Sequence, residues 1–458
     1  MKQDGISKYK VKGYRIKIAK ENKYLMYAAE PDFDFDQDPL VFAELSSIIF
    51  KNKGRLGEKI LKFDELVSVL KSIFMWKVLE IDDLPTEPDL FAELFIFKLI
   101  KLDRIMPLFL DDKVNEIYLD QMNAPIYIDH KIFGRCNTKI VLEEEEIRSL
   151  ITRLKLEHPI SVTTKKPSLK IEFKTNDFHM RISMDFPPLS PNGPTFNIRK
   201  FHRNPLKLVD LVELKTLSPI IASYLIEVVK ERRNITVIGE PNSGKTTLAN
   251  AIDLYTPKHW RKIAIEDAIE SINQTELGYK QLLIQIDSFE SNRSLYTKTS
   301  EILKLLHRSP DWIYLGEIQS SEHTRAMFEA LNAGLKGIQT AHADSIEKIL
   351  RRWENLHKIS VTDFLSLDTI IIMKREITEN NFIRTIAEIY EVRTENIQND
   401  EKYGFLEKIY DSSWKKERTT TRIKEVSFIK EKIDSIVEGE IQLQEQINKK
   451  NKQLITVK

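Results

Sequence analysis

The 458-residue sequence predicts an α/β fold with a doubly wound sheet, preceded by an α+β domain and a small helical unit. Apolar residues recur at intervals of three and four over about 59–110, a spacing that favours helices. Alternating apolar positions flank a helical stretch between about 106 and 200, which is typical of a mixed α+β domain. From residue 206 onward, short apolar runs alternate with helical segments. We therefore expect a largely parallel sheet with helices on both faces.

The predicted domains follow these changes in pattern. We expect an N-terminal helical unit over 1–105, an α+β domain over 106–205, an α/β domain over 206–395 and a charged, largely helical tail over 396–458. Four prolines within 187–194 precede the boundary between the second and third domains. An apolar stripe in the tail predicts an amphipathic helix that either packs on its own domain or binds a partner. The stripe comprises Ile423, Val426, Ile429, Ile433, Ile436 and Ile441.

The composition excludes several classes of protein. The chain has 70 Lys and Arg residues and 69 Asp and Glu residues, so its net charge is close to zero. Such a chain does not attract a polyanion through its overall charge, and nucleic acid is not the expected partner. Cys136 is the one cysteine, which rules out an intrachain disulfide and a Cys-rich zinc module and fits a reducing cytosol. No apolar run approaches the roughly 18 residues of a membrane span, so we expect any membrane contact to need a partner.

A phosphate-binding loop follows the apolar strand at 235–238. Residues 239–246 read Gly-Glu-Pro-Asn-Ser-Gly-Lys-Thr and fit the pattern G-x-x-x-x-G-K-S/T throughout. The glycines allow a tight turn whose N–H groups face the α- and β-phosphates, while Lys245 reaches the β- and γ-phosphates and the Thr246 hydroxyl binds Mg²⁺. A helix-compatible segment follows, which makes a chance glycine-rich turn the weaker alternative. The expected ATP contacts are Gly239, Pro241, Asn242, Ser243, Gly244, Lys245, Thr246 and Thr247.

Hydrolysis of a bound nucleotide also needs an acidic residue close to this loop. Glu317 follows Gly316 at the end of the apolar strand 312–315. We therefore expect Glu317 to activate the attacking water and to contribute to the coordination of Mg²⁺. A surface glutamate at the end of a strand would look the same in sequence.

Two further strand ends are expected at the same edge of the sheet. His342 ends one of them, where an imidazole can contact the γ-phosphate and report hydrolysis, although a lone histidine is more often structural. Glu266, Asp267 and Glu270 follow another strand. We expect Glu266 and Asp267 to help hold Mg²⁺ and water and count Glu266 among the catalytic candidates, while a solvated turn would look similar.

Four blocks in one order give the chain a family resemblance. They are the phosphate loop at 239–246, the acidic box at 265–270, the segment 309–318 with Glu322, and Thr-Ala-His-Ala at 340–343. Together they resemble the ATPases of type II and type IV secretion, type IV pilus assembly and archaellum assembly, and especially the archaeal members. The resemblance extends upstream through 193–201, 127–130 and 114–117 and covers about 106–390. The phosphate loop is generic, whereas the four blocks at these spacings are fairly specific.

The resemblance implies a RecA-like ATPase domain that uses ATP and Mg²⁺ within a homo-hexameric ring. In this family the N-terminal domain of one subunit covers the nucleotide of its neighbour and supplies arginines. Arg199, Arg203 and Arg181 match those positions, with ordinary interdomain salt bridges as the alternative. The resemblance also implies a cytoplasmic protein at the inner face of the membrane, docked on a polytopic platform protein and acting indirectly on pilin-like filament subunits.

Several positions depart from the family pattern. Gln319 and His307 stand where arginine is usual, Leu335 replaces a common histidine, and Ala268 replaces a proline. None of these changes removes the phosphate loop or Glu317. We therefore still expect hydrolysis, with coupling between subunits altered or slow.

Three functions remain open at this point. The first is a motor that hydrolyses ATP to drive assembly of a filament or secretion. The second is a nucleic-acid motor on a RecA-like core, which the balanced charge counts against. The third is a nucleotide-binding adaptor with weak hydrolysis, which the departures from the family pattern keep open.

Overall fold

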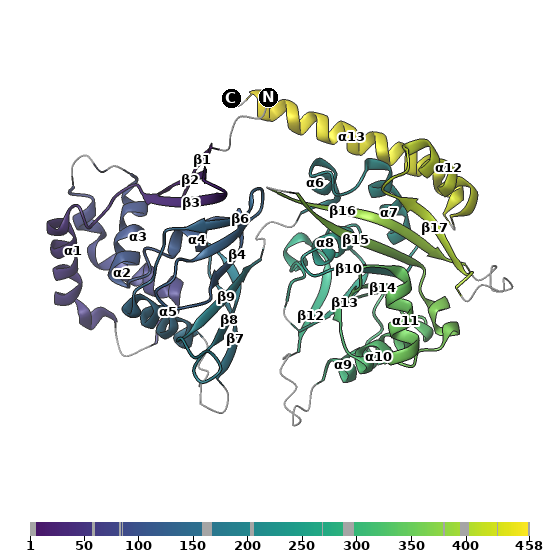
Figure 1. Cartoon of the computed structure of the whole chain (residues 1–458), viewed down its shortest axis with the longest axis horizontal. Coiled ribbons are helices and arrows are strands. Elements are labelled where there is room, and N and C mark those ends of the chain that lie inside the picture. The colour runs from purple at the N-terminus through teal and green to yellow at the C-terminus, as the bar shows by residue number, and fades with distance from the viewer. Residues whose placement is uncertain are drawn as a thin grey trace. The chain divides into compact units, whose positions relative to one another are not determined.

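A computed structural model describes most of the chain, and Figure 1 labels its strands and helices. The described residues are 6–56, 60–81, 84, 86–157, 167–201, 206–267, 269–286, 297–378, 381–393, 403–427 and 429–456. The chain divides into two compact units, one of 1–203 with 379–382 and the other of 204–378 with 383–458. Among the described residues, no helix is long and apolar enough to cross a bilayer.

The first unit is built on a nine-stranded sheet with the order β1-β2-β3-β6-β5-β4-β9-β8-β7. Its neighbouring strands pair antiparallel, apart from the parallel pair β3 and β6. The strands are β1 (Ile6–Val11), β2 (Tyr14–Glu21), β3 (Tyr24–Pro31), β4 (Val114–Leu119), β5 (Tyr127–His130), β6 (Gly134–Thr138), β7 (Ser168–Lys174), β8 (His179–Asp185) and β9 (Thr195–Lys200).

Helices and one face of this sheet enclose the core of the first unit. The helices are α1 (Pro39–Lys51), α2 (Phe63–Val78), α3 (Pro88–Leu99), α4 (Met106–Leu110) and α5 (Glu144–Glu157). A buried row crosses six strands and consists of Ile171, Ile182, Ile198, Ile117, Ile128 and Cys136. Because side chains alternate along a strand, the residues next to this row lie on the opposite face of the sheet.

The prediction of a helical unit over 1–105 is wrong for its first part. Residues 6–31 form the strands β1, β2 and β3, and β3 joins the rest of the sheet through β6. The alternation of buried Tyr14, Ile16 and Ile18 was a strand signal, which the stronger helical period beginning near residue 60 obscured. The structure also does not divide the chain at residue 105, because 1–203 lie in one compact unit.

The second unit contains an eight-stranded sheet with the order β12-β11-β13-β14-β10-β15-β16-β17. From β12 to β15 the neighbouring strands are parallel, so their carboxyl ends lie at one edge. The strands are β10 (Ile235–Gly239), β11 (Arg261–Glu266), β12 (Lys280–Gln285), β13 (Trp312–Ile318), β14 (Gly337–His342), β15 (Thr369–Thr378), β16 (Asn381–Val392) and β17 (Leu406–Asp411).

Helices cover both faces of this second sheet, as Figure 1 shows. One core includes α6 (Leu208–Glu213), α7 (Pro219–Lys230), α8 (Lys245–Asp253), α12 (Lys416–Val426) and α13 (Ile433–Thr456). The other includes α9 (Lys298–Lys304), α10 (Ser321–Asn332) and α11 (Ile346–Arg351). Short 3₁₀- or π-helices occur at Lys53–Leu56, Thr275–Leu277, Leu305–His307, Arg352–Leu356, Val361–Ser366 and Lys430–Lys432. The predicted α/β fold with a doubly wound sheet is confirmed.

The C-terminal segment belongs to the second unit. Ile423, Ile429 and Ile436 are buried in the core that α7 helps to form, so this part of the predicted apolar stripe packs on its own unit, whereas Ile441 is exposed. Glu391 of β16 is fully buried, and its carboxylate accepts hydrogen bonds from Ser427 at 2.5 Å and from Tyr224 of α7 at 2.6 Å. These contacts fix the segment between α12 and α13 against the sheet.

Candidate functional site

The phosphate loop has a conformation that requires its two motif glycines. A Cβ on Gly239 would lie 2.6 Å from the carbonyl oxygen of Met373 and 2.5 Å from Ser243 Oγ, closer than side chains approach. Gly244 has φ of +95°, in the left-handed region that glycine adopts without strain. β10 is buried along its whole length before the loop, and α8 begins directly after it at Lys245. The strand–loop–helix context expected of such a motif is therefore present.

The remaining loop residues surround the first turn of α8. Ser243 and Lys245 are buried, Thr246 and Thr247 are half-buried, and Pro241 is exposed. The N–H groups at a helix N-terminus lack partners within the helix and favour anions, so this turn suits a phosphate group.

Three of the predicted site residues lie in direct contact. Lys245 Nζ donates hydrogen bonds to the Glu240 carbonyl oxygen at 2.9 Å and to His342 Nδ1 at 3.0 Å. An ammonium group can only donate, so Nδ1 accepts and the ring proton lies on Nε2, which faces Glu317 Oε1. Burial and, secondly, the charge of Lys245 lower the pKa of His342, which favours the neutral ring. A chain of contacts thus connects the loop to Glu317 through His342.

Glu317 sits at an irregularity in β13. The pairing register with β14 shifts between Leu315 and Glu317, so Gly316 is an extra residue that re-aims the end of the strand. A Cβ on Gly316 would lie 3.0 Å from Glu266 Cγ. The glycine therefore makes room for Glu266 of the neighbouring strand. The second carboxylate oxygen of Glu317 accepts a hydrogen bond from Gln319 Nε2 at 2.6 Å.

The acidic box at the end of β11 makes other contacts. Glu266 is buried and accepts hydrogen bonds from the Ser271 hydroxyl at 2.5 Å and from the backbone N–H groups of Ser271 and Glu270. Burial raises its pKa to about 7. Asp267 forms an ion pair with Lys298 at 2.9 Å, and Ala268 lies outside the described residues. These contacts shape the turn after β11.

The fit of Mg²⁺ can be judged from these side chains. In the part of the chain that the structure describes, no group of three or more His, Cys, Asp or Glu residues could hold a metal ion. Mg²⁺ usually keeps several waters and binds substrate phosphates with only one or two protein ligands. The Thr246 hydroxyl at the start of α8 suits such a role, with Glu317 as the carboxylate candidate, whereas Glu266 and Asp267 are held by Ser271 and Lys298.

The predicted arginines belong to the first unit. Arg181 of β8 and Arg199 of β9 are paired across neighbouring strands, on the face opposite the buried row. The Arg181 guanidinium lies 5.4 Å from the centre of the Phe201 ring. Arg203 lies outside the described residues. A role of these arginines at the phosphate loop stays a prediction.

Two basic residues at the site were not predicted. Lys298 of α9 donates hydrogen bonds to Asp267 and to the backbone carbonyl of Glu317. Arg384 of β16 donates from Nε to the carbonyl of Asn242, in the phosphate loop, at 2.8 Å. Neither lies in a motif, and each meets the site only through tertiary contacts that the local sequence does not encode.

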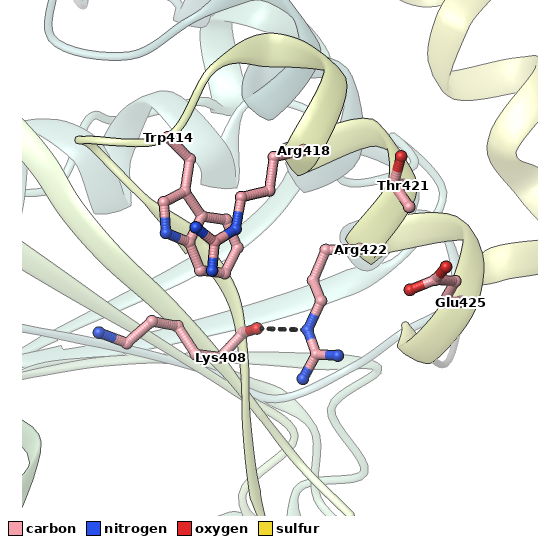
Figure 2. A pocket seen from close by; sticks show the side chains of 6 residues that line it. All are labelled: Lys408, Trp414, Arg418, Thr421, Arg422 and Glu425. Carbon is pink, nitrogen blue, oxygen red and sulfur yellow. Dashed lines mark hydrogen bonds between the residues drawn. The ribbon is translucent and has the colours of Figure 1, made fainter.

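A separate cavity of about 410 Å³ lies in the C-terminal segment (Figure 2). Its lining consists of Lys408, Trp414, Arg418, Thr421, Arg422 and Glu425. Lys408 is neutralised by Glu388 and Asp411, Arg422 by Glu407, and the Arg418 guanidinium lies 4.2 Å from the centre of the Trp414 ring. The cavity contains no residue of the phosphate loop and is distinct from the candidate site.

Comparison with known proteins identifies relatives of this chain. It is 27% identical over 235 residues to the uncharacterized protein MJ0781 of Methanocaldococcus jannaschii, covering 50% of this chain and 32% of that protein. It is 30% identical over 177 residues to the conjugal transfer protein TrbB of Rhizobium radiobacter, covering 37% and 50%. The matches thus span half or less of the length of these relatives. The X-ray structure of the Legionella pneumophila ATPase DotB matches with 20% identity and a TM-score of 0.45, over 66% of this chain and 81% of that one.

A family model provides the broadest match. The model described as "Type II/IV secretion system protein" matches residues 92–457, which is most of the chain. This match confirms the resemblance predicted from the four sequence blocks. The chain therefore belongs to the type II/IV secretion system protein family.

Proposed function

We propose that the chain is a Mg²⁺-dependent ATPase that powers a type IV pilus-like filament or a secretion system. One observation carries the proposal. The phosphate-loop Lys245, His342 and Glu317 are in contact across the ends of β10, β14 and β13. Family membership supports the same activity.

The contacts suggest how the residues act when ATP binds. Lys245 has to leave the Glu240 carbonyl and His342 to reach the phosphate oxygens, which carry more charge than either partner. His342 Nδ1 then loses the hydrogen bond from Lys245. Because the same imidazole ring contacts Glu317, binding of ATP in the loop changes the surroundings of Glu317. Glu317 orients and deprotonates the attacking water. Thr246 would hold Mg²⁺ together with the phosphates, and the ion would offset the negative charge of the transferred phosphoryl group.

The larger assembly is part of the proposal. Six copies form a ring in which Arg199, Arg181 and Arg203 of one subunit reach the nucleotide of the next. The ring acts in the cytoplasm, at the inner face of the membrane, docked on a polytopic platform protein, and handles pilin-like subunits only indirectly. Membership of the secretion family supports this arrangement, and the relative in Methanocaldococcus jannaschii supports an archaeal-type member.

A second candidate function is a nucleotide-binding adaptor with weak hydrolysis. The observation that favours it is the engagement of both carboxylate oxygens of Glu317, one by His342 and the other by Gln319. A carboxylate whose two oxygens are already in contact with other side chains has less room to accept a hydrogen bond from the attacking water. Gln319→Ala frees one of these oxygens, and we expect it to raise turnover by several-fold, since a hydrogen bond to a charged group contributes about 1.5–3 kcal/mol.

Turnover of ATP by the purified chain tests the proposal. We expect Mg²⁺-dependent release of phosphate that Lys245→Ala abolishes. Binding of ATP with no release in either the wild type or Gln319→Ala would favour the adaptor instead. Strong stimulation by single- or double-stranded DNA would favour the nucleic-acid motor.

A further inference from the structure

Lys298 is a buried lysine with two partners at the candidate site. Its side chain is only 1% exposed. Its ammonium donates to Asp267 Oδ2 at 2.9 Å and to the backbone carbonyl oxygen of Glu317 at 2.6 Å. A buried charge costs several kcal/mol unless it is paired and hydrogen-bonded, so these two contacts account for its presence.

The preceding residue fixes where this lysine begins its helix. Thr297 precedes α9, and its hydroxyl oxygen accepts a hydrogen bond from the Ser300 N–H at 3.1 Å. This cap determines the backbone at the first residue of α9, which is Lys298. The lysine is therefore held in place from its own helix as well as by its partners.

The contact with Glu317 falls at the irregularity in β13. A bulge interrupts the regular ladder of backbone hydrogen bonds, and here it lies between Leu315 and Glu317. Lys298 supplies a donor to the Glu317 carbonyl at that point and, through Asp267, ties the end of β13 to the end of β11. The peptide group that follows Glu317 is thus held by a charge-assisted hydrogen bond, which fixes the backbone from which the Glu317 side chain extends.

We propose that Lys298 is a positioning residue that holds Glu317 in the geometry needed for hydrolysis. The inference rests on the proposed ATPase function and adds a residue outside the four sequence blocks. Lys298 acts on the backbone of Glu317, and its hydrogen bonds go to Asp267 and to the Glu317 carbonyl oxygen. Its loss should therefore lower the catalytic rate while leaving nucleotide affinity unchanged.

A second buried lysine provides a matched control. The side chain of Lys262 is 2% exposed, and its ammonium pairs with Asp253 at 2.6 Å and bonds to Thr256 and Gln274. It lies near the start of β11, at the opposite end of that strand from Glu266. Both lysines are buried, ion-paired and in the same unit, and Lys298 is the one bonded to Glu317.

The experiment compares Lys298→Met with Lys262→Met in the full chain. We expect both variants to lower the melting temperature. Only Lys298→Met should lower kcat, by about tenfold or more, because small misplacements of a reacting group have effects of this size. The Kd for ATP should stay within about twofold of wild type, and Lys298→Arg, which keeps a cationic donor, should recover a large part of kcat.

Asp267→Asn provides a second, milder test. It removes the charge of the partner but leaves Lys298 able to donate to the Glu317 carbonyl oxygen, so kcat should fall less than in Lys298→Met. If Lys298→Met does not fold, Lys298→Ala takes its place in this comparison. Wild-type kcat in folded Lys298→Met or Lys298→Ala, or an equal loss in Lys262→Met, overturns the inference. A wild-type chain without turnover overturns the proposed function and this inference with it.

Discussion

Glu317 receives contacts from three separate segments of the chain. Its carboxylate contacts His342 of β14 and Gln319 just beyond β13, and its backbone carbonyl accepts from Lys298 of α9. The geometry of Glu317 therefore depends on residues from several elements. Substitutions at these neighbours should affect hydrolysis more than they affect nucleotide binding.

The proximity of Lys245, His342 and Glu317 could be predicted from sequence. Each follows a short apolar run, and the carboxyl ends of parallel strands meet at one edge of a sheet. Lys298 and Arg384 could not be predicted in the same way. Their roles arise from burial and from contacts with distant segments, and no local pattern records either property.

The buried Glu266 gives stability a pH dependence. Its pKa is raised from 4.5 to about 7 by burial, so its folded-state pKa lies above its unfolded value. Its contribution is fully present below about pH 4.5 and is lost as the pH rises through about 7, a loss on the order of 3 kcal/mol. We expect Glu266→Gln to flatten this part of the pH profile.

Chemical denaturation at about pH 5 and about pH 8 measures the effect. The difference in the free energy of unfolding between the two pH values should be larger for wild type than for Glu266→Gln. Equal differences for the two proteins would mean that Glu266 titrates normally in the folded chain.

At the element scale, periodicity predicted the regular α/β part of the second unit well. It did less well for strands that are buried on both faces and for strands whose alternation is weaker than a nearby helical pattern. β15 contains the fully buried run Ile370–Met373, which has no alternation because both faces of the sheet are covered. Such a run cannot be distinguished from a buried helix by period alone. β1 to β3 were missed for a different reason. They pair with one another along the chain, and only β3 also pairs with β6, but the stronger helical period beginning near residue 60 obscured their alternation.

The packing of α13 can be tested with two isoleucines of the predicted stripe. Ile436 is completely buried in the core that includes α7, whereas Ile441 is 55% exposed. Ile436→Ala should lower the free energy of unfolding by about 2–4 kcal/mol because it leaves a cavity. Ile441→Ala should change it by no more than about 0.5 kcal/mol, as expected at the surface. Equal effects in urea denaturation would contradict the packing of this helix on its own unit.

At the scale of the whole molecule, the chain consists of two compact units. The phosphate loop and Glu317 belong to the second unit, whereas Arg181 and Arg199 belong to the first. Sequence predicted only part of each sheet, where the apolar pattern is local, and it missed β1 to β3. The arrangement of subunits in a ring is a property of several chains, and only the family resemblance predicts it. A test of the ring must therefore use mixtures of chains.

Complementation between two inactive variants provides that test. Glu317→Gln and Arg199→Ala chains should each be nearly inactive alone. Mixing them should create interfaces in which an intact Glu317 faces an intact Arg199, so activity should exceed the sum of the separate preparations. Arg181→Ala should behave like Arg199→Ala.

The control mixture combines Lys245→Ala with Glu317→Gln. Both changes lie in the second unit at one candidate site, so every site in the mixture is defective and no rescue is expected. If chains that demonstrably co-assemble show no rescue with Arg199→Ala, the arginines do not act between subunits.

The central claim is that the phosphate loop binds ATP and Glu317 drives its hydrolysis. The most direct measurement compares ATP binding and turnover in wild type and Glu317→Gln. We predict that the variant retains the wild-type Kd for ATP and loses turnover by about 10² or more, the usual scale for loss of a general base. Turnover by Glu317→Gln at the wild-type rate would contradict the claim.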